Sequence, residues 1–232
     1  MNEVLDAALA EASDAGLNVQ AVLSAARVPE LGASGSLVLL ASTGRRLWSH
    51  VDRSLQDPID TWSLEALRRL QSRLPWATRL LFPSPPDAPH LDVLAAGRAA
   101  GWAHPSPLGI GIHPEHGLWM GYRGLLEVQA DLPERGILDA PSPCAACPRP
   151  CVDACVGGAF QADSGAPLGV SLDLPTCFGS RLSDARCATS CTSRLTCPIG
   201  SASAYDPEQL THHQEAGNRF WRRYVREDAT PE

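Results

Sequence analysis

Eight cysteines crowd into one stretch of the chain, and they are the residues with the clearest capacity for chemistry. The first 143 residues contain none. The positions are Cys144, Cys147, Cys151, Cys155, Cys177, Cys187, Cys191 and Cys197. Such a cluster of thiols is typical of a disulfide framework, a zinc site or iron–sulfur clusters. The spacing has to decide between these.

Three simpler interpretations fit the spacing poorly. An even number of cysteines permits disulfides, but the acidic start of the chain carries no export signal and cytosolic thiols stay reduced. A structural zinc site uses two well-separated pairs, whereas Cys151 and Cys155 follow the pair Cys144 and Cys147 too closely. A thioredoxin-like motif needs a strand and then a helix around its Cys-x2-Cys, and neither is indicated here.

An iron–sulfur interpretation uses every cysteine. A four-iron cluster takes four thiolates at the corners of a cuboid, three from a tight loop and one from a distant residue. The stretch from Cys144 to Cys155 is such a loop, and the stretch from Cys187 to Cys197 is its partner, with Cys177 leading in. Nearby glycines let backbone N–H groups approach sulfur; they are Gly157, Gly158, Gly165, Gly169 and Gly179. We therefore predict two 4Fe-4S clusters.

The cysteine pattern also carries a family resemblance. Cys144-x2-Cys147-x3-Cys151-x3-Cys155-x2-Gly158, with the later run ending in Cys197-Pro198-x-Gly200, resembles small bacterial 4Fe-4S ferredoxin-type proteins. It also resembles the ferredoxin module of epoxyqueuosine reductase and the reductive dehalogenases, in which that module accompanies a cobalamin-binding domain. The resemblance implies that the last cysteine of each run crosses to the other cluster. One cluster then takes Cys144, Cys147, Cys151 and Cys197, and the other takes Cys155, Cys177, Cys187 and Cys191.

The residues before the cysteines predict a mixed α and β structure. The apolar run at 37–40 predicts a buried strand, and residues 79–82 and 120–129 predict two more. Asp57 and Pro58 open a predicted helix with one apolar face, formed by Leu64, Leu67, Leu70 and Leu74. A second helix is predicted at 91–101, after prolines at Pro83, Pro85 and Pro86 stop the preceding strand.

A second resemblance covers roughly residues 35 to 135. Ile112-His113-Pro114-x2-Gly117-x-Trp119-x3-Arg123-Gly124 is similar to the CblC family of cobalamin-processing proteins. It implies an α+β fold with a nitroreductase-like, CblC-like antiparallel sheet flanked by helices, and a corrin lying over the sheet. His113, Trp119 and Arg123 are then candidate cofactor-binding residues. The alternatives are a histidine held by backbone carbonyls in a turn, a core tryptophan and an arginine in a surface pair.

These patterns divide the chain into three parts. We predict a CblC-like α+β domain at 1–138, a two-cluster ferredoxin module at 139–200 and a C-terminal helical segment at 201–232. In that segment four residues form one face of an amphipathic helix that docks on its own protein, namely Phe220, Trp221, Tyr224 and Val225. The interleaved arginines there also suit RNA, which is the less favoured interpretation.

Composition narrows the possible partners and location. Apolar residues make up 44% of the chain and charged residues 19%, as in a folded globular protein. The net charge is −7, from 19 arginines, no lysine and 26 acidic residues, which argues against a nucleic-acid partner. The longest aliphatic run, residues 37–41, is far short of the roughly 20 residues that span a bilayer. We expect a cytoplasmic protein without a membrane partner.

The predicted function is electron transfer through two 4Fe-4S clusters to a redox partner protein. In one version the electrons reach a corrinoid, cobalamin, bound by the N-terminal domain, and the protein is a cobalamin-linked reductase and hence an oxidoreductase. In the alternative it is a plain electron carrier, and the N-terminal domain is a docking scaffold without a cofactor. No catalytic side chain is assigned, since the chain lacks a nucleophile elbow and a phosphate-binding loop.

Overall fold

The chain forms two units that interleave along the sequence. The computed structural model describes residues 2–84 and 91–227. One unit consists of Met1–His104 and Trp119–Pro141, and the other of Pro105–Leu118 and Ser142–Glu232. The segment Pro105–Leu118, which the sequence analysis counted with the N-terminal domain, thus belongs to the same unit as the cysteines.

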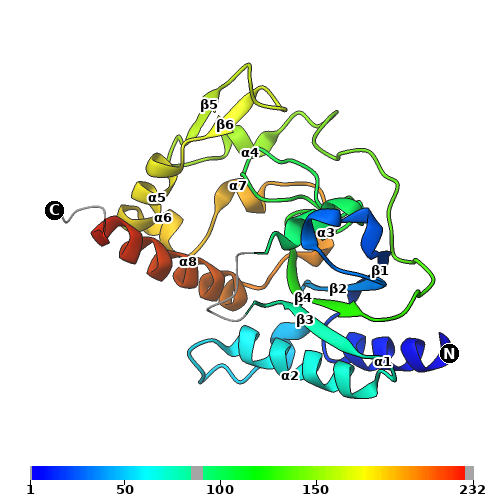
Figure 1. Ribbon diagram of the computed structural model, residues 1–232. Coiled ribbons are helices and arrows are strands. Elements are labelled where there is room, and N and C mark those ends of the chain that lie inside the picture. The colour runs from blue at the N-terminus through cyan, green and yellow to red at the C-terminus, as the bar shows by residue number, and fades with distance from the viewer. Residues whose placement is uncertain (1, 85–90, 228–232) are drawn as a thin grey trace. The chain divides into compact units, whose positions relative to one another are not determined.

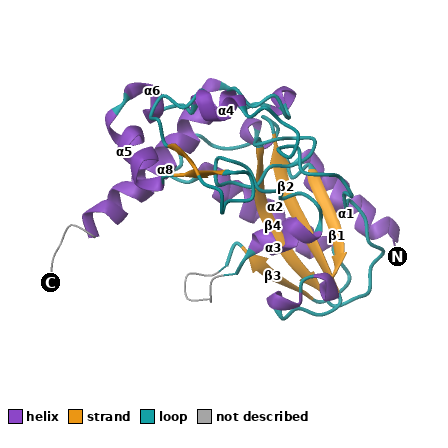
Figure 2. Cartoon of the chain, turned by 90° about the horizontal axis from the view of Figure 1, so that it is seen from above, coloured by secondary structure: helices purple, strands orange, loops and turns teal. Residues whose placement is uncertain are grey.

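The first unit is built on a four-stranded antiparallel sheet with helices on its faces. The strand order is β1-β2-β4-β3, so β2 and β4 occupy the centre (Figure 2). The elements in chain order are α1 (Asn2–Asp14), β1 (Val19–Ser24), β2 (Ser36–Thr43), α2 (Pro58–Arg73), β3 (Thr78–Phe82), α3 (Val93–Ala99) and β4 (Met120–Val128). The prediction of an α+β fold with an antiparallel sheet and flanking helices is confirmed at this level.

Strand β2 shows why the sheet is covered on both sides. All eight of its residues are buried, and successive side chains of a strand point to opposite faces. Leu37 and Leu39 pack in the cluster that contains α3. Val38 and Leu40 pack in the cluster that contains α1 and α2. Figure 1 shows α1 and α2 together on one side of this sheet and α3 on the other.

The local predictions for this unit hold with small changes in length. Helix α2 has Pro58 in its first turn and buries Leu67 and Leu70, as its apolar periodicity indicates. Helix α3 is shorter than the predicted 91–101; it begins at Val93 because Asp92 caps it by accepting a hydrogen bond from the Leu94 N–H at 3.0 Å. The predicted strands at 37–40, 79–82 and 120–129 correspond to β2, β3 and β4. Pro85 and Pro86 lie outside the described residues.

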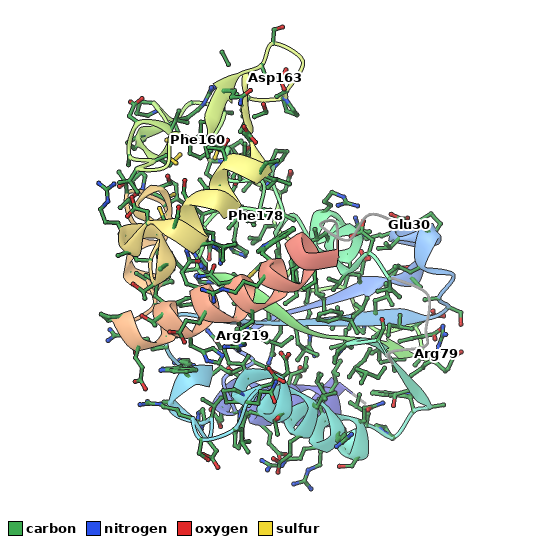
Figure 3. The ribbon with its side chains drawn as sticks, turned by 90° about the vertical axis from the view of Figure 1, so that its left-hand side faces the viewer. Glu30, Arg79, Phe160, Asp163, Phe178 and Arg219 are labelled. Atoms are coloured by element: carbon green, nitrogen blue, oxygen red, sulfur yellow. The ribbon has the colours of Figure 1, made fainter. Side chains whose placement is uncertain are left out.

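The second unit consists of several short helices, one small hairpin and one longer helix of 21 residues. Its elements are α4 (Pro150–Asp153), β5 (Phe160–Ala162), β6 (Val170–Leu172), α5 (Leu174–Ser183), α6 (Ala185–Ala188), α7 (Thr192–Leu195) and α8 (Pro207–Glu227). Strands β5 and β6 pair in antiparallel fashion, with Asp163 just beyond the end of β5 (Figure 3). Because all of these elements except α8 are short, side-chain packing and loop contacts must hold the unit together.

The C-terminal segment forms the helix that its sequence predicts, but one face was assigned wrongly. Trp221 stacks on Phe178 of α5 with ring centroids 3.5 Å apart, whereas Phe220 is 54% exposed. Adjacent helical residues point about 100° apart, so only one of these two can face α5. The side chains of Tyr224 and Val225 lie outside the described residues. No helix in the described part of the chain is long and apolar enough to cross a membrane.

Candidate metal centres

The structure gathers the eight thiols into two sets of four. All eight cysteines are free. The thiol of Cys144 interacts electrostatically with three others, those of Cys147, Cys151 and Cys197. The thiol of Cys177 interacts with those of Cys155, Cys187 and Cys191. We call these sets the first quartet and the second quartet. They match the grouping that the ferredoxin resemblance implied, while metal binding itself remains a prediction.

The first quartet sits in an apolar environment. Cys144, Cys151 and Cys197 are 6%, 7% and 8% exposed, and Cys147 is half-buried. Cys144 and Cys197 pack in one cluster with Ile112 and Leu118, against which Leu108, Leu168 and Ile199 are packed. A centre bound here would be shielded from water on the side that these residues cover.

The loop that carries three cysteines of this quartet is held in a tight conformation. Arg149, between two prolines, adopts the left-handed conformation with φ of 58° and immediately precedes α4. Its backbone N–H donates to the Cys147 Sγ at 3.4 Å, and its side chain donates to the carbonyl of Leu168. The loop therefore offers an amide to sulfur, as in protein iron–sulfur sites, where hydrogen bonds to sulfur tune the centre.

A turn from the segment Pro105–Leu118 supports the fourth cysteine of the first quartet. The turn is closed by two backbone hydrogen bonds of 2.9 Å between His113 and Gly117. Gly117 and Gly200 are both in the left-handed region, and a side chain on Gly200 would lie 2.1 Å from the His116 carbonyl carbon. The turn thus packs backbone against backbone on the loop after Cys197, which requires glycine at this contact.

The second quartet is more open. Cys155 follows α4, Cys177 lies in α5, Cys187 lies in α6 and Cys191 caps the start of α7, and all four are half-buried. All four line one cavity of about 420 Å³, whose wall also contains Arg181. The Ala159 N–H donates to the Cys155 Sγ at 3.5 Å. The thiols of the first quartet are therefore largely enclosed, whereas those of the second quartet face an accessible cavity.

Helix α8 fixes the loop that carries Cys187 and Cys191. The Gln214 side-chain amide donates to the carbonyls of Cys187 and Ser190 at 3.0 and 3.1 Å. One turn later, the Asn218 amide donates to the carbonyl of Ala188 at 3.0 Å. Spaced four residues apart, the two amides lie on one face of the helix. They satisfy three loop carbonyls and so hold two cysteines of the quartet in place.

A hydrogen bond also joins the two cysteine runs. Helix α4, from the first run, packs against α7, from the second. The Thr192 hydroxyl at the start of α7 donates to the carbonyl of Ala154 at 2.6 Å. Since Ala154 precedes Cys155 and Thr192 follows Cys191, this contact brings together two members of the second quartet.

Burial raises the pKa of five of the thiols and so favours their protonated form. Burial is the largest influence on Cys144 and raises its pKa to about 11, and the neighbouring thiols add to this rise. The pKa values of Cys151, Cys197, Cys177 and Cys187 are raised for the same main reason. A metal that binds these groups as thiolates must displace their protons.

Among residues 2–84 and 91–227, no group of three or more His, Cys, Asp or Glu side chains is arranged to hold a metal ion.

The three candidate cofactor residues fall in different units. His113 is 2% exposed in the second unit, and its Nδ1 accepts from the N–H groups of Glu115 and His116 at 3.1 and 3.2 Å. Trp119 is 1% exposed, and Arg123 on β4 donates from Nε to the Ser42 hydroxyl at 2.9 Å; both belong to the first unit. His113 thus lies within its own turn, as the simpler alternative expected, but its Nδ1 accepts from backbone N–H groups instead of donating to carbonyls. Corrin contacts by these residues remain a prediction.

Sequence reasoning did not identify the residues that support the quartets. Arg181, Gln214 and Asn218 carry no recognisable motif, although the spacing of Gln214 and Asn218 by four on a predicted helix was a usable signal. The role of Gly200 beside the turn at His113 had no local signal, because the two segments are distant in sequence. No protein-family model matches this chain, and no curated protein is significantly similar to it.

Proposed function

We propose that the second unit binds two 4Fe-4S clusters, one on each quartet, and that the protein transfers single electrons through them. The observation that carries this proposal is the sorting of eight free thiols into two sets of four. Each set joins cysteines from separate stretches, as a cuboid cluster requires. Cys197 and Cys155 are each grouped with the more distant run, which is the arrangement of two-cluster ferredoxins.

The surroundings of the thiols fit such clusters. A cluster differs from a single metal ion because each thiolate binds its own iron at a separate corner, so the four sulfurs need not converge on one point. Amide groups from Arg149 and Ala159 reach the sulfurs of Cys147 and Cys155. The second quartet already encloses part of a cavity. When bound, the clusters supply one-electron redox chemistry at potentials that the protein sets.

The protein's own residues have separable tasks in this function. Ile112 and Leu118 keep water from the first quartet, and Gln214 and Asn218 hold the loop of the second. The net charge of −7 disfavours the addition of an electron and supports a low reduction potential. The unit thereby combines one enclosed centre with one that is open to exchange.

The test is anaerobic purification with iron, zinc and acid-labile sulfide determined per chain, followed by electron paramagnetic resonance of the reduced protein. Two clusters require about eight irons and about eight sulfides. About four irons would leave one quartet without a cluster and remove half of the proposal. One or two zinc ions without sulfide would overturn it.

We further propose that the first unit serves as a CblC-like, nitroreductase-like domain whose corrinoid accepts the electrons. The support is the four-stranded antiparallel sheet with helices on its faces, which agrees with the fold that the sequence resemblance implies. The test is titration of cobalamin into the reduced full-length chain. A changed visible spectrum of the corrinoid is expected. An unchanged spectrum would leave the plain electron carrier, with the first unit as a docking scaffold.

A further inference from the structure

One arginine is directed at the second quartet from the helix that carries Cys177. Arg181 lies four residues after Cys177 in α5, so both side chains project from the same face of the helix. Both line the cavity that the other three thiols of the quartet share. Arg181 is half-buried, and the titratable groups that interact with its guanidinium are the thiols of Cys177, Cys187 and Cys191.

Helix α8 holds this guanidinium with neutral oxygens. The Arg181 Nε donates to the Asn218 Oδ1 at 2.9 Å, and one Nη donates to the carbonyl of Gln214 at 3.0 Å. Gly217 makes room, because a side chain there would lie 2.6 Å from that Nη. In the described part of the chain no carboxylate forms an ion pair with Arg181. Its charge is therefore fixed in place but not neutralised.

Two other arginines near the second quartet, Arg186 and Arg194, do not combine a fixed position at the cavity with a charge that lacks a carboxylate partner. Arg186 is exposed and pairs with Asp184 at 2.6 Å, so the two charges largely cancel. Arg194 lines the same cavity, but its guanidinium donates to the Leu118 carbonyl and lies 4.8 Å from the centre of the Tyr205 ring. Arg181 thus combines proximity, fixed position and an unpaired charge.

We propose that Arg181 is the residue that raises the reduction potential of the second cluster, and that Asn218 and the Gln214 backbone position it for this role. The reduction step adds one electron to a cluster that its thiolates already make anionic, and no bond forms or breaks. A fixed cation stabilises the reduced state more than the oxidised state, because the charge it faces is larger. Burial lowers the pKa of Arg181, yet an arginine remains charged in proteins.

This inference rests on the proposed function, and a failure of the inference can be distinguished from a failure of the proposed function. Iron and sulfide content of the unaltered chain decides whether the clusters exist. If the chain binds none, both proposals are overturned. If it binds two, the proposed clusters stand whatever the Arg181 variants show.

The test is a redox titration of the full-length protein, monitored by electron paramagnetic resonance, with Arg181→Gln, Arg181→Lys and Arg219→Gln. Arg181→Gln removes the charge and should shift the potential of the second cluster to more negative values while the first cluster keeps its own. Arg181→Lys keeps the charge and should restore most of the potential. Arg219 is the matched control, because it lies on α8 (Figure 3), follows Asn218 in sequence and is exposed. Its loss should leave both potentials unchanged.

Two results would overturn the proposal. One is an unchanged potential in Arg181→Gln with both clusters assembled, and the other is an equal shift in Arg219→Gln, which would indicate a general charge effect. If Arg181→Gln loses the second cluster, Asn218→Asp is compared with Asn218→Ala, because both lose the hydrogen bond to the Ala188 carbonyl and only the aspartate places a carboxylate against the Arg181 Nε. A second potential more negative in Asn218→Asp than in Asn218→Ala supports the proposal, and equal potentials in the two variants overturn it.

Discussion

The two quartets consist of the same kind of side chain, the cysteine thiol, in opposite surroundings. Three of the four thiols in the first quartet are less than 9% exposed, and two of these, Cys144 and Cys197, pack with aliphatic side chains. All four thiols of the second are half-buried and line a cavity of about 420 Å³ that also holds a cation. In the proposed function, this difference assigns exchange with a partner to the second cluster and internal relay to the first. Under that proposal, burial and charge alone would separate the tasks of two otherwise similar sets of thiols.

The largest effect is expected from exchanging the cysteine that crosses between the runs. Cys197 follows Cys191 in sequence but belongs to the first quartet. Cys197→Ser should therefore lose the first cluster, about four irons, and leave the spectrum of the second. Cys191→Ser should do the reverse. Iron content and electron paramagnetic resonance of both variants measure this.

Cys144→Ser provides the control for that assignment. It should leave the same residual spectrum as Cys197→Ser, because both remove a ligand of the first quartet. A residual spectrum of Cys197→Ser that matches Cys191→Ser instead would contradict the grouping of the thiols.

A second prediction concerns chemical attack on the unaltered protein. Ferricyanide or an iron chelator should destroy the second cluster before the first, because its thiols are the more accessible ones. The decay of the two paramagnetic signals with time measures the order. Loss of both signals at one rate, with the fold intact by circular dichroism, would mean that exposure of the thiols does not control access.

A smaller effect is expected where the turn at His113 meets the loop after Cys197. Gly200→Ala forces a side chain against the His116 backbone at 2.1 Å and should destabilise the protein by about 3 kcal/mol, with preferential loss of the first cluster. Gly169→Ala is the matched control, since Gly169 has nearly the same φ but nothing within 4 Å of the added carbon. It should cost about 1–2 kcal/mol and spare both clusters. Thermal unfolding and iron retention distinguish the two, and equal losses would refute the packing explanation.

The smallest effect is expected from the hydrogen bond between the two runs. Thr192→Val removes the donor to the Ala154 carbonyl and should cost about 1 kcal/mol, with faster loss of the second cluster. Thr196→Val is the control, because that exposed hydroxyl donates only to the carbonyl of Thr192 within its own turn. Denaturant unfolding of the two variants is the measurement. A similar stability for both would show that the link between the runs contributes nothing.

The local sequence pattern was sufficient to predict several helices and strands of the first unit. The apolar run of β2 and the leucine spacing of α2 indicated their structure, because burial of apolar side chains at a period of two or about 3.6 determines both elements. The grouping of the thiols also followed from spacing, read through a known cluster arrangement. These features depend on residues that are close in sequence or on a strict ligand geometry.

Long-range contacts were not accessible in the same way. The motif around His113 was a candidate for a corrin pocket because it resembles the CblC family, but nothing in the motif indicated that its turn packs on Gly200, more than eighty residues later. The hydrogen bond from Arg181 to Asn218 joins α5 to α8, and no periodic pattern in the sequence indicates it. The exposure of Phe220 beside the buried face of Trp221 depends on the exact rotation of α8. Such features are decided by tertiary packing, which pattern alone does not encode.

The backbone contact between Gly117 and the Ile199 carbonyl restricts how this protein can be divided. A fragment cut at residue 139 would carry every cysteine but would lack the turn on which the Cys197 loop rests. A longer fragment cut at residue 105 would retain the turn together with β4, stripped of its neighbouring strands. The cysteine-rich unit therefore cannot be cut out as one continuous segment of the chain. A shortened protein that keeps both this turn and an intact sheet has to begin no later than strand β1.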